Sequence, residues 1–560
     1  MLTEKKRPWY ETMAFYQIWP RSFRDGNGDG IGDLYGVYEK LDYLKALGVD
    51  GIWFSPLYPS PNADYGYDIS DYRNISPDYG DLEIFKKVLD GAHTRGMKVI
   101  MDLVINHTSD EHAWFNASKD RKSPYHDYYF WRDGRPGGKP PNDWDSLFEG
   151  KAWQWDEAAG QYYLHLFAVK QPDLNMDNPR VRKEVIDIMR FWLDMGVDGF
   201  REDVITFISK AEGLPNDPFM VGAKGMRHYS SGPLIHEYLQ EFRREALDRY
   251  DCMTVGEAPM MTPRRALSYI GGKRPDLGLM FNFQHMGADC LFTEYFPRPF
   301  SLRKLKRAFS RWQNAMAGRA WHTLYLENHD HPRIISRYGS EKYRAESGKS
   351  LACAYLFQRG TPFVYQGQEI GMTNVARPRI EDYKDVVARR QYERAVKKKG
   401  PENALRLIHR ASRDSARTPV QWSDAEHAGF SMAEPWFSVN PNYREINVRA
   451  QEDDPASLLN FYRNALALRK ATPAAIDGAY REFHPLNRRF YAYERVLGAS
   501  RMLVVCSLSE KPSRFRAPGN WALAGLTPAL CSYPDAPLQG NGFKLRPYEA
   551  RVYITNAERA

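Results

Sequence analysis

Short apolar runs alternate with longer amphipathic segments along most of the 560 residues, and this rhythm restricts the fold more than any other feature. The predicted strands are residues 14–18, 51–54, 98–103, 198–200, 253–255, 321–325 and 362–365. The predicted helices that separate several of them are residues 37–47, 82–95, 179–195 and 233–250. Strands that alternate with helices build parallel βαβ units. About eight such units before residue 480 predict an α/β fold with a (β/α)8 TIM barrel.

Two segments interrupt this rhythm, and the pattern changes near the C-terminus. Residues 107–172 form a long, polar and aromatic excursion after the third strand, which is typical of an inserted subdomain. Residues 373–455 are irregular and charged, and only short strands follow residue 480, at 490–494, 502–507 and 550–554. We therefore predict a barrel of residues 1–106 and 173–480, a subdomain of residues 107–172 and a C-terminal antiparallel β-sandwich of residues 481–560.

Composition excludes several classes of protein. The net charge of +8 comes from 78 basic and 70 acidic residues, which is too weak a bias to indicate a nucleic-acid partner. The five cysteines are widely spaced and form no C-x-x-C pair, so they favour reduced thiols over a disulfide framework or a metal site. No apolar stretch reaches 18 residues, and the N-terminus has no apolar segment of signal-peptide length. We expect a cytoplasmic protein with no membrane partner, no organic cofactor, and a monomeric or weakly homo-oligomeric state.

Polar residues gather where four predicted strands end. His107 follows the third strand, Asp203 the fourth, Glu257 the fifth and Asp330 a later one. Barrel enzymes carry their active sites at the carboxyl ends of the strands. A single acid or histidine at such a place is more often a cap or a structural residue, but four in order favour a functional site.

The fourth strand reads Gly-Phe-Arg-Glu-Asp and has a pattern of its own. Side chains alternate along a strand, so Arg201 and Asp203 should share one face while Glu202 points to the other. An arginine beside Asp203 should favour its ionised form, which a nucleophile requires. Glu257 directly follows an apolar strand, a setting that suits a general acid. The aromatic content of 14% agrees with a carbohydrate site, since sugar rings stack on aromatic faces.

With these residues in place, the chain resembles the α-amylase superfamily of glycoside hydrolases (glycoside hydrolase family 13). The motifs DLVINH, GFREDV, GE and ENHD occur in the family's order. Longer stretches resemble the branch of oligo-1,6-glucosidases, isomaltases and dextran glucosidases, namely QIWPRSF, ADYGYDISDY, LHLFAVKQPDLN, SRDSARTPVQW and PWFSVNPNY. The resemblance covers nearly the whole chain.

The resemblance implies a double-displacement mechanism with net retention. Asp203 matches the nucleophile, Glu257 the general acid/base, and Asp330 the third essential carboxylate, which binds sugar hydroxyls and stabilises the distorted ring. Retention requires the first two carboxyl groups to lie roughly 5 Å apart.

The resemblance also implies a set of substrate-binding residues around the terminal glucose. Asp64 would pair with Arg417 and close one end of the pocket, so that single glucose units leave from non-reducing chain ends. Val204 follows the nucleophile, and in this branch valine there accompanies a preference for α-1,6 linkages. The remaining members are Tyr67, which would stack under the ring, Arg201, which would orient Asp203, and Phe167, Gln171, His107 and His329, which would line the pocket or bind hydroxyls.

A Gly- and Asp-rich segment near the N-terminus has the spacing of a calcium loop. Oxygen donors fall at the first, third, fifth, seventh and ninth places, which are Asp25, Asn27, Asp29, the Ile31 carbonyl and Asp33. The twelfth place is glycine, so no bidentate glutamate completes the loop, and a metal-free turn is the alternative. The resemblance favours a structural Ca²⁺.

Several positions depart from the family pattern, and they leave open whether water or a sugar accepts the glucosyl group. They are Glu202, usually apolar; the run Ala258-Pro259-Met260-Met261 after the general acid; Met176, often tryptophan; and His331, often glutamine. The closest alternative function is an α-glucosyltransferase or sucrose isomerase that uses the same glucosyl-enzyme. A trehalose-6-phosphate hydrolase would need a phosphate site that the sequence does not reveal. A non-catalytic relative such as a transporter heavy chain is disfavoured, because all three carboxylates are present.

Overall fold

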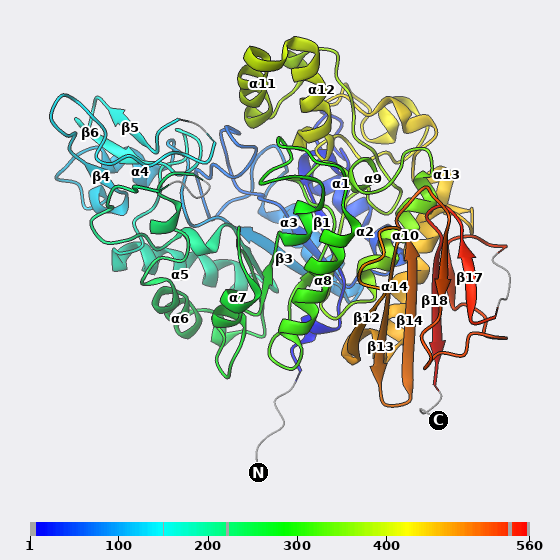
Figure 1. Cartoon of the computed structure of the whole chain (residues 1–560). Helices are drawn as coiled ribbons and strands as arrows, with labels where there is room; N and C mark the ends of the chain where they lie inside the picture. The colour runs from blue at the N-terminus through cyan, green and yellow to red at the C-terminus, as the bar shows by residue number, and fades with distance from the viewer. Residues whose placement is uncertain (1–6, 149, 220–222, 536–539, 557–560) are drawn as a thin grey trace. The chain divides into compact units, whose positions relative to one another are not determined.

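The structure is a computed structural model that describes residues 7–148, 150–219, 223–535 and 540–556. The chain divides into two compact units, and Figure 1 labels many of their helices and strands. The first unit contains Met1–Ile52, Thr262–Leu267 and Phe283–Ala560, and the second contains Trp53–Met261 and Ser268–Asn282.

Eight parallel strands form one sheet in the order β10-β11-β1-β2-β3-β7-β8-β9, so the predicted (β/α)8 barrel is confirmed. The strands are β1 (Phe15–Ile18), β2 (Gly51–Phe54), β3 (Lys98–Leu103), β7 (Gly199–Glu202), β8 (Met253–Glu257), β9 (Leu279–Phe281), β10 (Thr323–Leu324) and β11 (Thr361–Tyr365). Seven of them coincide with predicted strands. The eighth, β9, was not predicted, because three residues are too few to show a strand pattern.

Helices follow the strands, and their capping residues are visible in the sequence. The helices of the barrel are α1 (Leu34–Glu39), α2 (Leu41–Leu47), α3 (Leu82–Thr94), α5 (Pro179–Asp194), α6 (Ile235–Glu245), α7 (Pro263–Ile270), α8 (Leu302–Met316), α9 (Ile334–Arg337), α10 (Arg344–Leu356), α13 (Arg449–Glu452), α14 (Leu458–Ala471) and α15 (Pro473–Asp477). Asp81 caps α3 by accepting from the amides of Glu83 and Ile84, and Asn178 caps α5, which has a proline in its first turn.

Two predicted helices have different bounds. Residues 37–47 lie in two helices that meet at Lys40, and α6 ends at Glu245, before a 3₁₀ turn at Leu247–Arg249. At both places the helix is interrupted while the spacing of apolar residues along the sequence stays largely helical. The sequence pattern therefore does not reveal the interruption.

In the second unit, the segment after β3 carries a small antiparallel sheet of its own. Its strands β4 (Trp131–Arg132), β6 (Gln161–Leu164) and β5 (Trp153–Asp156) pair in that order, and α4 (Ala113–Ser118) precedes them. Trp144, Trp153 and Phe167 form an apolar cluster with Val204 and Phe207. The segment is thereby packed against the residues that follow β7.

The excursion at residues 373–455 is not irregular throughout, and this expectation is wrong for part of it. It contains α11 (Val386–Lys399) and α12 (Pro401–Ala411), which lie side by side in Figure 1. The buried residues of α11 are Ala388 and Ala395 alone among those described. So thin an apolar stripe gives no clear helical period in the sequence.

The C-terminal region is a pair of antiparallel sheets, as predicted. One sheet has the order β12-β13-β14-β18-β16 and the other contains β15 and β17 (Figure 1). Their bounds are β12 (Ala479–Phe483), β13 (Phe490–Leu497), β14 (Ser500–Ser507), β15 (Ser513–Arg516), β16 (Leu530–Cys531), β17 (Gly542–Leu545) and β18 (Ala550–Thr555). Phe490 and Leu503 of the first sheet share one core with Phe515 and Phe543 of the second. Side chains of both sheets therefore fill a common interior, as in a β-sandwich.

Among the described residues, no helix has both the length and the apolar character needed to cross a bilayer. All five cysteines are free thiols.

Candidate active site

Arg201 of β7 binds three carboxylates at the carboxyl ends of neighbouring strands. Its Nη1 lies 2.6 Å from Asp102 Oδ1 and 2.7 Å from Asp203 Oδ1, and its Nη2 lies 2.5 Å from Glu257 Oε2. The parallel register explains the meeting, since Asp102 of β3 and Val255 of β8 are both paired with Arg201. The guanidinium is 2% exposed, so these contacts are made away from water.

One guanidinium cannot neutralise three buried carboxylates. Burial raises the pKa of Asp203 well above its ordinary value; Arg201 opposes this rise, and Glu257 and Asp102 add to it. Burial also raises the pKa of Asp102 to about 6, against the effect of Arg201. Arg201 favours the ionised form of Asp203, as expected, but burial and the neighbouring carboxylates Glu257 and Asp102 outweigh this effect, so the pKa of Asp203 stays raised. Asp203 and Glu257 bind the same guanidinium, and Glu257 disfavours the ionised form of Asp203.

The residue after Asp203 has a strained backbone. Val204 has φ 35° and ψ 38°, in the left-handed region that a β-branched residue rarely adopts. This conformation turns its N–H toward Glu257, whose Oε2 accepts at 3.3 Å. Strain of this kind persists where the surrounding structure holds it, and it gathers at functional sites.

The predicted substrate residues of the second unit lie together. Gln171 Nε2 is 3.4 Å from Asp64 Oδ2 and 3.2 Å from His107 Nε2. His107 Nε2 is 3.1 Å from the Tyr67 carbonyl, and its ring centroid is 5.0 Å from that of Phe167. Burial lowers the pKa of His107 to about 4, so the ring is neutral and acts as a hydrogen-bonding group.

This group of residues is linked directly to the carboxylate cluster. The Tyr67 hydroxyl donates to Asp102 at 3.0 Å, and the guanidinium carbon of Arg201 lies 5.8 Å from the Tyr67 ring centroid. Asp102 was not predicted as a site residue. The sequence did contain a signal, because Asp102 opens the DLVINH motif on the strand next to Arg201.

A buried ion pair beside His107 was also missed. Lys210 Nζ lies 2.8 Å from Asp173 Oδ2 and 3.0 Å from Asn106 Oδ1, and both charged side chains are fully buried. Asn106 Nδ2 donates to Asp173 as well. The three side chains hold the strand end that carries His107; Asn106 and Asp173 lie in motifs that the sequence analysis singled out, whereas Lys210 does not.

In the first unit, Asp330 is surrounded by cationic and histidine side chains. Its carboxylate lies 2.9 Å from His329 Nε2, 3.0 Å from Arg413 Nη1 and 3.1 Å from Arg417 Nη2. Burial works to raise its pKa, but His329, Arg413 and Arg417 together hold the pKa well below the ordinary value. Asp330 is therefore ionised.

Aromatic and amide groups fix this second cluster. Trp19 stacks on His329 with centroids 5.2 Å apart, and the Arg417 guanidinium carbon lies 4.6 Å from the Trp19 ring. Gln17 Nε2 is 2.7 Å from His329 Nδ1. His329, Asp330 and Arg417 thus meet as predicted within this unit, whereas Gln17, Trp19 and Arg413 were missed. The pairing of Asp64 with Arg417 stays a prediction.

The loop predicted to bind calcium is held by its own backbone amides. Asp25 accepts from the amides of Gly28 and Gly30 and from the Ser431 hydroxyl, and Asp33 accepts from the amides of Gly26, Asn27 and Gly36. Asn27 and Asp29 each accept from an amide two residues later. The donors are oxygens, which suit Ca²⁺. No group of three or more His, Cys, Asp or Glu is arranged to hold a metal within the described part of the chain.

The departures from the family pattern fall in varied environments. His331 Nδ1 lies 2.8 Å from Glu294 Oε1, which also pairs with Arg337 at 3.0 Å. Met176 is fully buried, Ala258 is buried and Met260 is 58% exposed.

Glu202 points away from the carboxylate cluster, as predicted. It is 1% exposed, and its Oε2 has no hydrogen-bond partner among the described residues. Burial raises the pKa of Glu202 to about 8; Arg243 of α6 opposes the rise and Asp276 adds to it.

Comparisons with known proteins agree with this arrangement of residues. The alpha-amylase catalytic domain family matches residues 17–478. An oligo-1,6-glucosidase of Parageobacillus thermoglucosidasius is 48% identical over 557 residues, which are 98% of this chain and 99% of that protein. An oligo-1,6-glucosidase of Halalkalibacterium halodurans is 46% identical, with 98% and 99% covered.

Solved structures of the same family superpose on this chain. The trehalose-6-phosphate hydrolase of Bacillus licheniformis matches with a TM-score of 0.93 at 41% identity, covering 98% of this chain and 100% of that one. The trehalulose synthase of Pseudomonas mesoacidophila MX-45 matches with a TM-score of 0.92 at 40% identity, covering 98% and 99%. With most of its length matched by the catalytic-domain family and by these relatives, the chain belongs to the α-amylase family of glycoside hydrolases.

Proposed function

We propose that the protein is a retaining, exo-acting α-glucosidase that releases glucose from the non-reducing ends of short α-glucosides and prefers α-1,6 linkages. One observation carries the mechanism: the carboxylates of Asp203 and Glu257 bind the two terminal nitrogens of the same guanidinium, that of Arg201. Inverting enzymes hold their two carboxyl groups about 6.5–9.5 Å apart to admit a water, whereas retaining enzymes hold them closer. The names of the two oligo-1,6-glucosidase relatives support the substrate class.

In the proposed reaction Asp203 is the ionised nucleophile, and Glu257 is the general acid that donates a proton. Asp203 attacks the anomeric carbon and forms a covalent bond to it, while Glu257 protonates the departing glycosidic oxygen. Glu257, now ionised, then takes a proton from water, which cleaves the glucosyl–Asp203 bond with net retention. Arg201 orients both groups, and Asp330, as an ionised acceptor, binds sugar hydroxyls.

The proposal gives the substrate-binding residues the roles expected from the sequence. Asp64 and Arg417 hold the terminal glucose, with hydroxyl contacts from Gln171, His107 and His329. Phe167 and Tyr67 supply the aromatic surfaces. Val204 narrows the entrance for the leaving group, and its packing among Phe167 and Phe207 supports a fixed position for its side chain.

The test is a time course of products from isomaltose, panose, maltose, sucrose and trehalose 6-phosphate. We expect glucose from isomaltose at a higher kcat/KM than from maltose, and no activity in Asp203→Ala. A clear preference for maltose removes the linkage proposal. Isomeric disaccharides from sucrose would instead indicate a sucrose isomerase, and cleavage of trehalose 6-phosphate alone would indicate a phosphosugar hydrolase.

We also propose that the loop of Asp25, Asn27, Asp29, Ile31 and Asp33 binds a structural Ca²⁺. The loop carries several oxygen donors in one turn, although its carboxylates already accept hydrogen bonds from amides. Chelation should lower Tm, and added Ca²⁺ should restore it. A metal-free preparation with an unchanged Tm would reject this site.

The proposal includes a cytoplasmic location and a monomeric or weakly associating state. Five free thiols favour a reducing compartment. Cell fractionation and sedimentation at several concentrations test the two points.

A further inference from the structure

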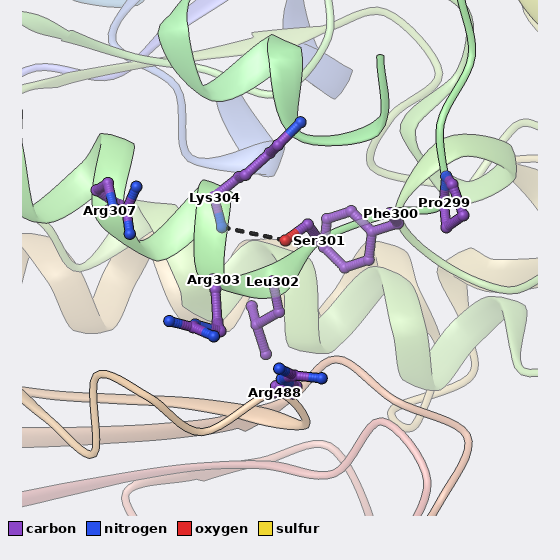
Figure 2. Close-up of a pocket in the computed structure, with 8 residues that line it drawn as sticks. All are labelled: Pro299, Phe300, Ser301, Leu302, Arg303, Lys304, Arg307 and Arg488. Carbon is purple, nitrogen blue, oxygen red and sulfur yellow. Dashed lines mark hydrogen bonds between the residues drawn. The ribbon is translucent and has the colours of Figure 1, made fainter. Parts of the chain in front are cut away.

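A cavity of about 440 Å³ lies at the start of α8, and none of the residues of the proposed reaction is among those that line it. Figure 2 shows its lining. Arg303, Lys304 and Arg307 come from α8, and Arg488 comes from the connection between β12 and β13. Among the described residues, no acidic side chain lines this cavity. Four cationic residues from two separate segments line it; in Figure 2 the Arg303 and Arg488 side chains lie close together, whereas the Lys304 side chain extends away from them.

None of Arg303, Lys304, Arg307 and Arg488 forms an ion pair within the part of the chain that the structure describes. Other surface arginines of this protein do: Arg406 pairs with a glutamate and Arg379 with an aspartate within one helical turn. The absence of ion pairs leaves these charges available to an anion.

Helix stability does not explain the cluster. Arg303 and Lys304 lie in the first turn of α8, where the helix dipole disfavours cations, and no acidic residue occurs in that turn. Arg303, Arg307 and Arg311 are spaced four residues apart, and like charges at this spacing destabilise a helix. These cationic residues therefore destabilise the start of α8 when no anion is bound, and a bound anion would remove this cost.

The cavity also has an apolar wall. Pro299, Phe300 and Leu302 line it beside the cations (Figure 2). Phe300 stacks on Tyr338, with centroids 4.7 Å apart and planes inclined by 23°, which fixes the ring. An inorganic anion has no apolar part that could contact this wall, whereas an organic anion does.

We propose that the cavity binds a small organic phosphate that carries at least two phosphoryl groups. Three guanidinium groups match phosphate oxygens in pairs, and the lysine adds a point charge. The volume lies within the range of pockets for small ligands. The sugar or nucleoside part would lie against Phe300 and Leu302. This proposal is independent of the glucosidase function.

The test is calorimetric titration of the full chain with fructose 1,6-bisphosphate and with ATP without magnesium, at about 50 mM salt. The two ligands distinguish a sugar bisphosphate from a nucleotide, and binding of either supports the proposal. Arg303→Ala/Arg307→Ala and, separately, Arg488→Ala should each weaken binding by about tenfold or more, since each removes charge-assisted hydrogen bonds. Inorganic phosphate should bind at least about tenfold more weakly than the better organic ligand.

The matched control is Lys397→Ala/Lys398→Ala, which removes two exposed positive charges from α11. It should change the affinity by less than about twofold. Equal loss of affinity in this control, unchanged affinity in the cavity variants, or equal binding of inorganic phosphate would overturn the proposal. So would failure of both organic ligands to bind at millimolar concentration while a heparin oligosaccharide binds. Thermal melts of each variant establish that it is folded.

Discussion

The buried carboxyl group of Glu202 gives the sharpest prediction about stability. It lies on the face of β7 that is turned away from Arg201, with an unpartnered Oε2 and a pKa raised by burial from 4.5 to about 8. The folded protein therefore holds this proton more tightly than the unfolded chain does. Between pH 4.5 and pH 8, Glu202 ionises in the unfolded chain but stays protonated in the folded protein, and this ionisation stabilises the unfolded state. The contribution of Glu202 to the free energy of unfolding therefore falls as the pH rises.

The size of this effect follows from the two pKa values. Each pH unit within the window lowers the free energy of unfolding by about 1.4 kcal/mol. From pH 5.5 to pH 8 the total is about 3 kcal/mol. With an unfolding entropy near 2.1 cal/mol/K per residue, this corresponds to a change in Tm of about 2–3 °C if the whole chain unfolds together.

Glu202→Gln removes the titration and keeps the shape of the side chain. The quantity to compare is the Tm of the variant minus the Tm of the wild type, measured by scanning fluorimetry at each pH. We expect this difference to be about 2–3 °C larger at pH 8 than at pH 5.5. Any fixed cost of the amide is the same at both pH values and cancels in this difference. Glu237→Gln, an exposed change on α6, is the control and should show no such dependence. A relative Tm for Glu202→Gln that is independent of pH would refute the reasoning.

Three further predictions concern the proposed reaction. Arg201→Gln leaves three buried carboxylates without their shared cation, so kcat on 4-nitrophenyl α-glucoside should fall by roughly 10²–10³ while circular dichroism shows a folded chain; a loss below tenfold contradicts the role. Arg413→Ala removes one cation from Asp330 and so raises the pKa of Asp330, which should move the acid limb of the pH profile of kcat/KM to higher pH. If the acid limb does not move, the ionisation of Asp330 does not limit activity. Val204→Ala should lower the ratio of kcat/KM for isomaltose over maltose by about tenfold, the scale of a few methyl contacts, and an unchanged ratio would reject the entrance hypothesis.

The fold was predictable from the sequence wherever the spacing of apolar residues and the positions of turn-forming residues indicated the same helix or strand. The strands before Asp203 and Glu257 are short apolar runs between clear helices, and each lies where the pattern indicates. Two features escaped for the same physical reason, namely a weak apolar signal. Strand β9 has three residues, and α11 buries little more than two alanines.

The site was predictable at the level of motifs and less so at the level of contacts. His107, Asp203, Glu257 and Asp330 each end a strand or follow one closely, and local order in the chain is enough to single them out. Contacts made through strand register or by distant segments leave no local trace. Arg201 was assigned to Asp203 because the two are neighbours, whereas it also binds Asp102 and Glu257. Lys210 and Arg413 escaped in the same way, since their partners are 37 and 83 residues away.

The two charged clusters differ in the balance of charge, and this difference identifies the source of the catalytic proton. Around Arg201, three carboxylates share one cation, and burial together with the neighbouring acids raises the pKa of Asp203 well above its ordinary value. Around Asp330, His329, Arg413 and Arg417 hold the pKa of the carboxyl group well below its ordinary value, even with Arg413 shared with Asp385, so Asp330 holds no proton to donate. The leaving group must then be protonated from the first cluster. Replacing Glu257 with glutamine should therefore slow substrates with poorly activated leaving groups far more than aryl glucosides, whose leaving groups need no proton, whereas Asp330→Asn should slow both classes alike.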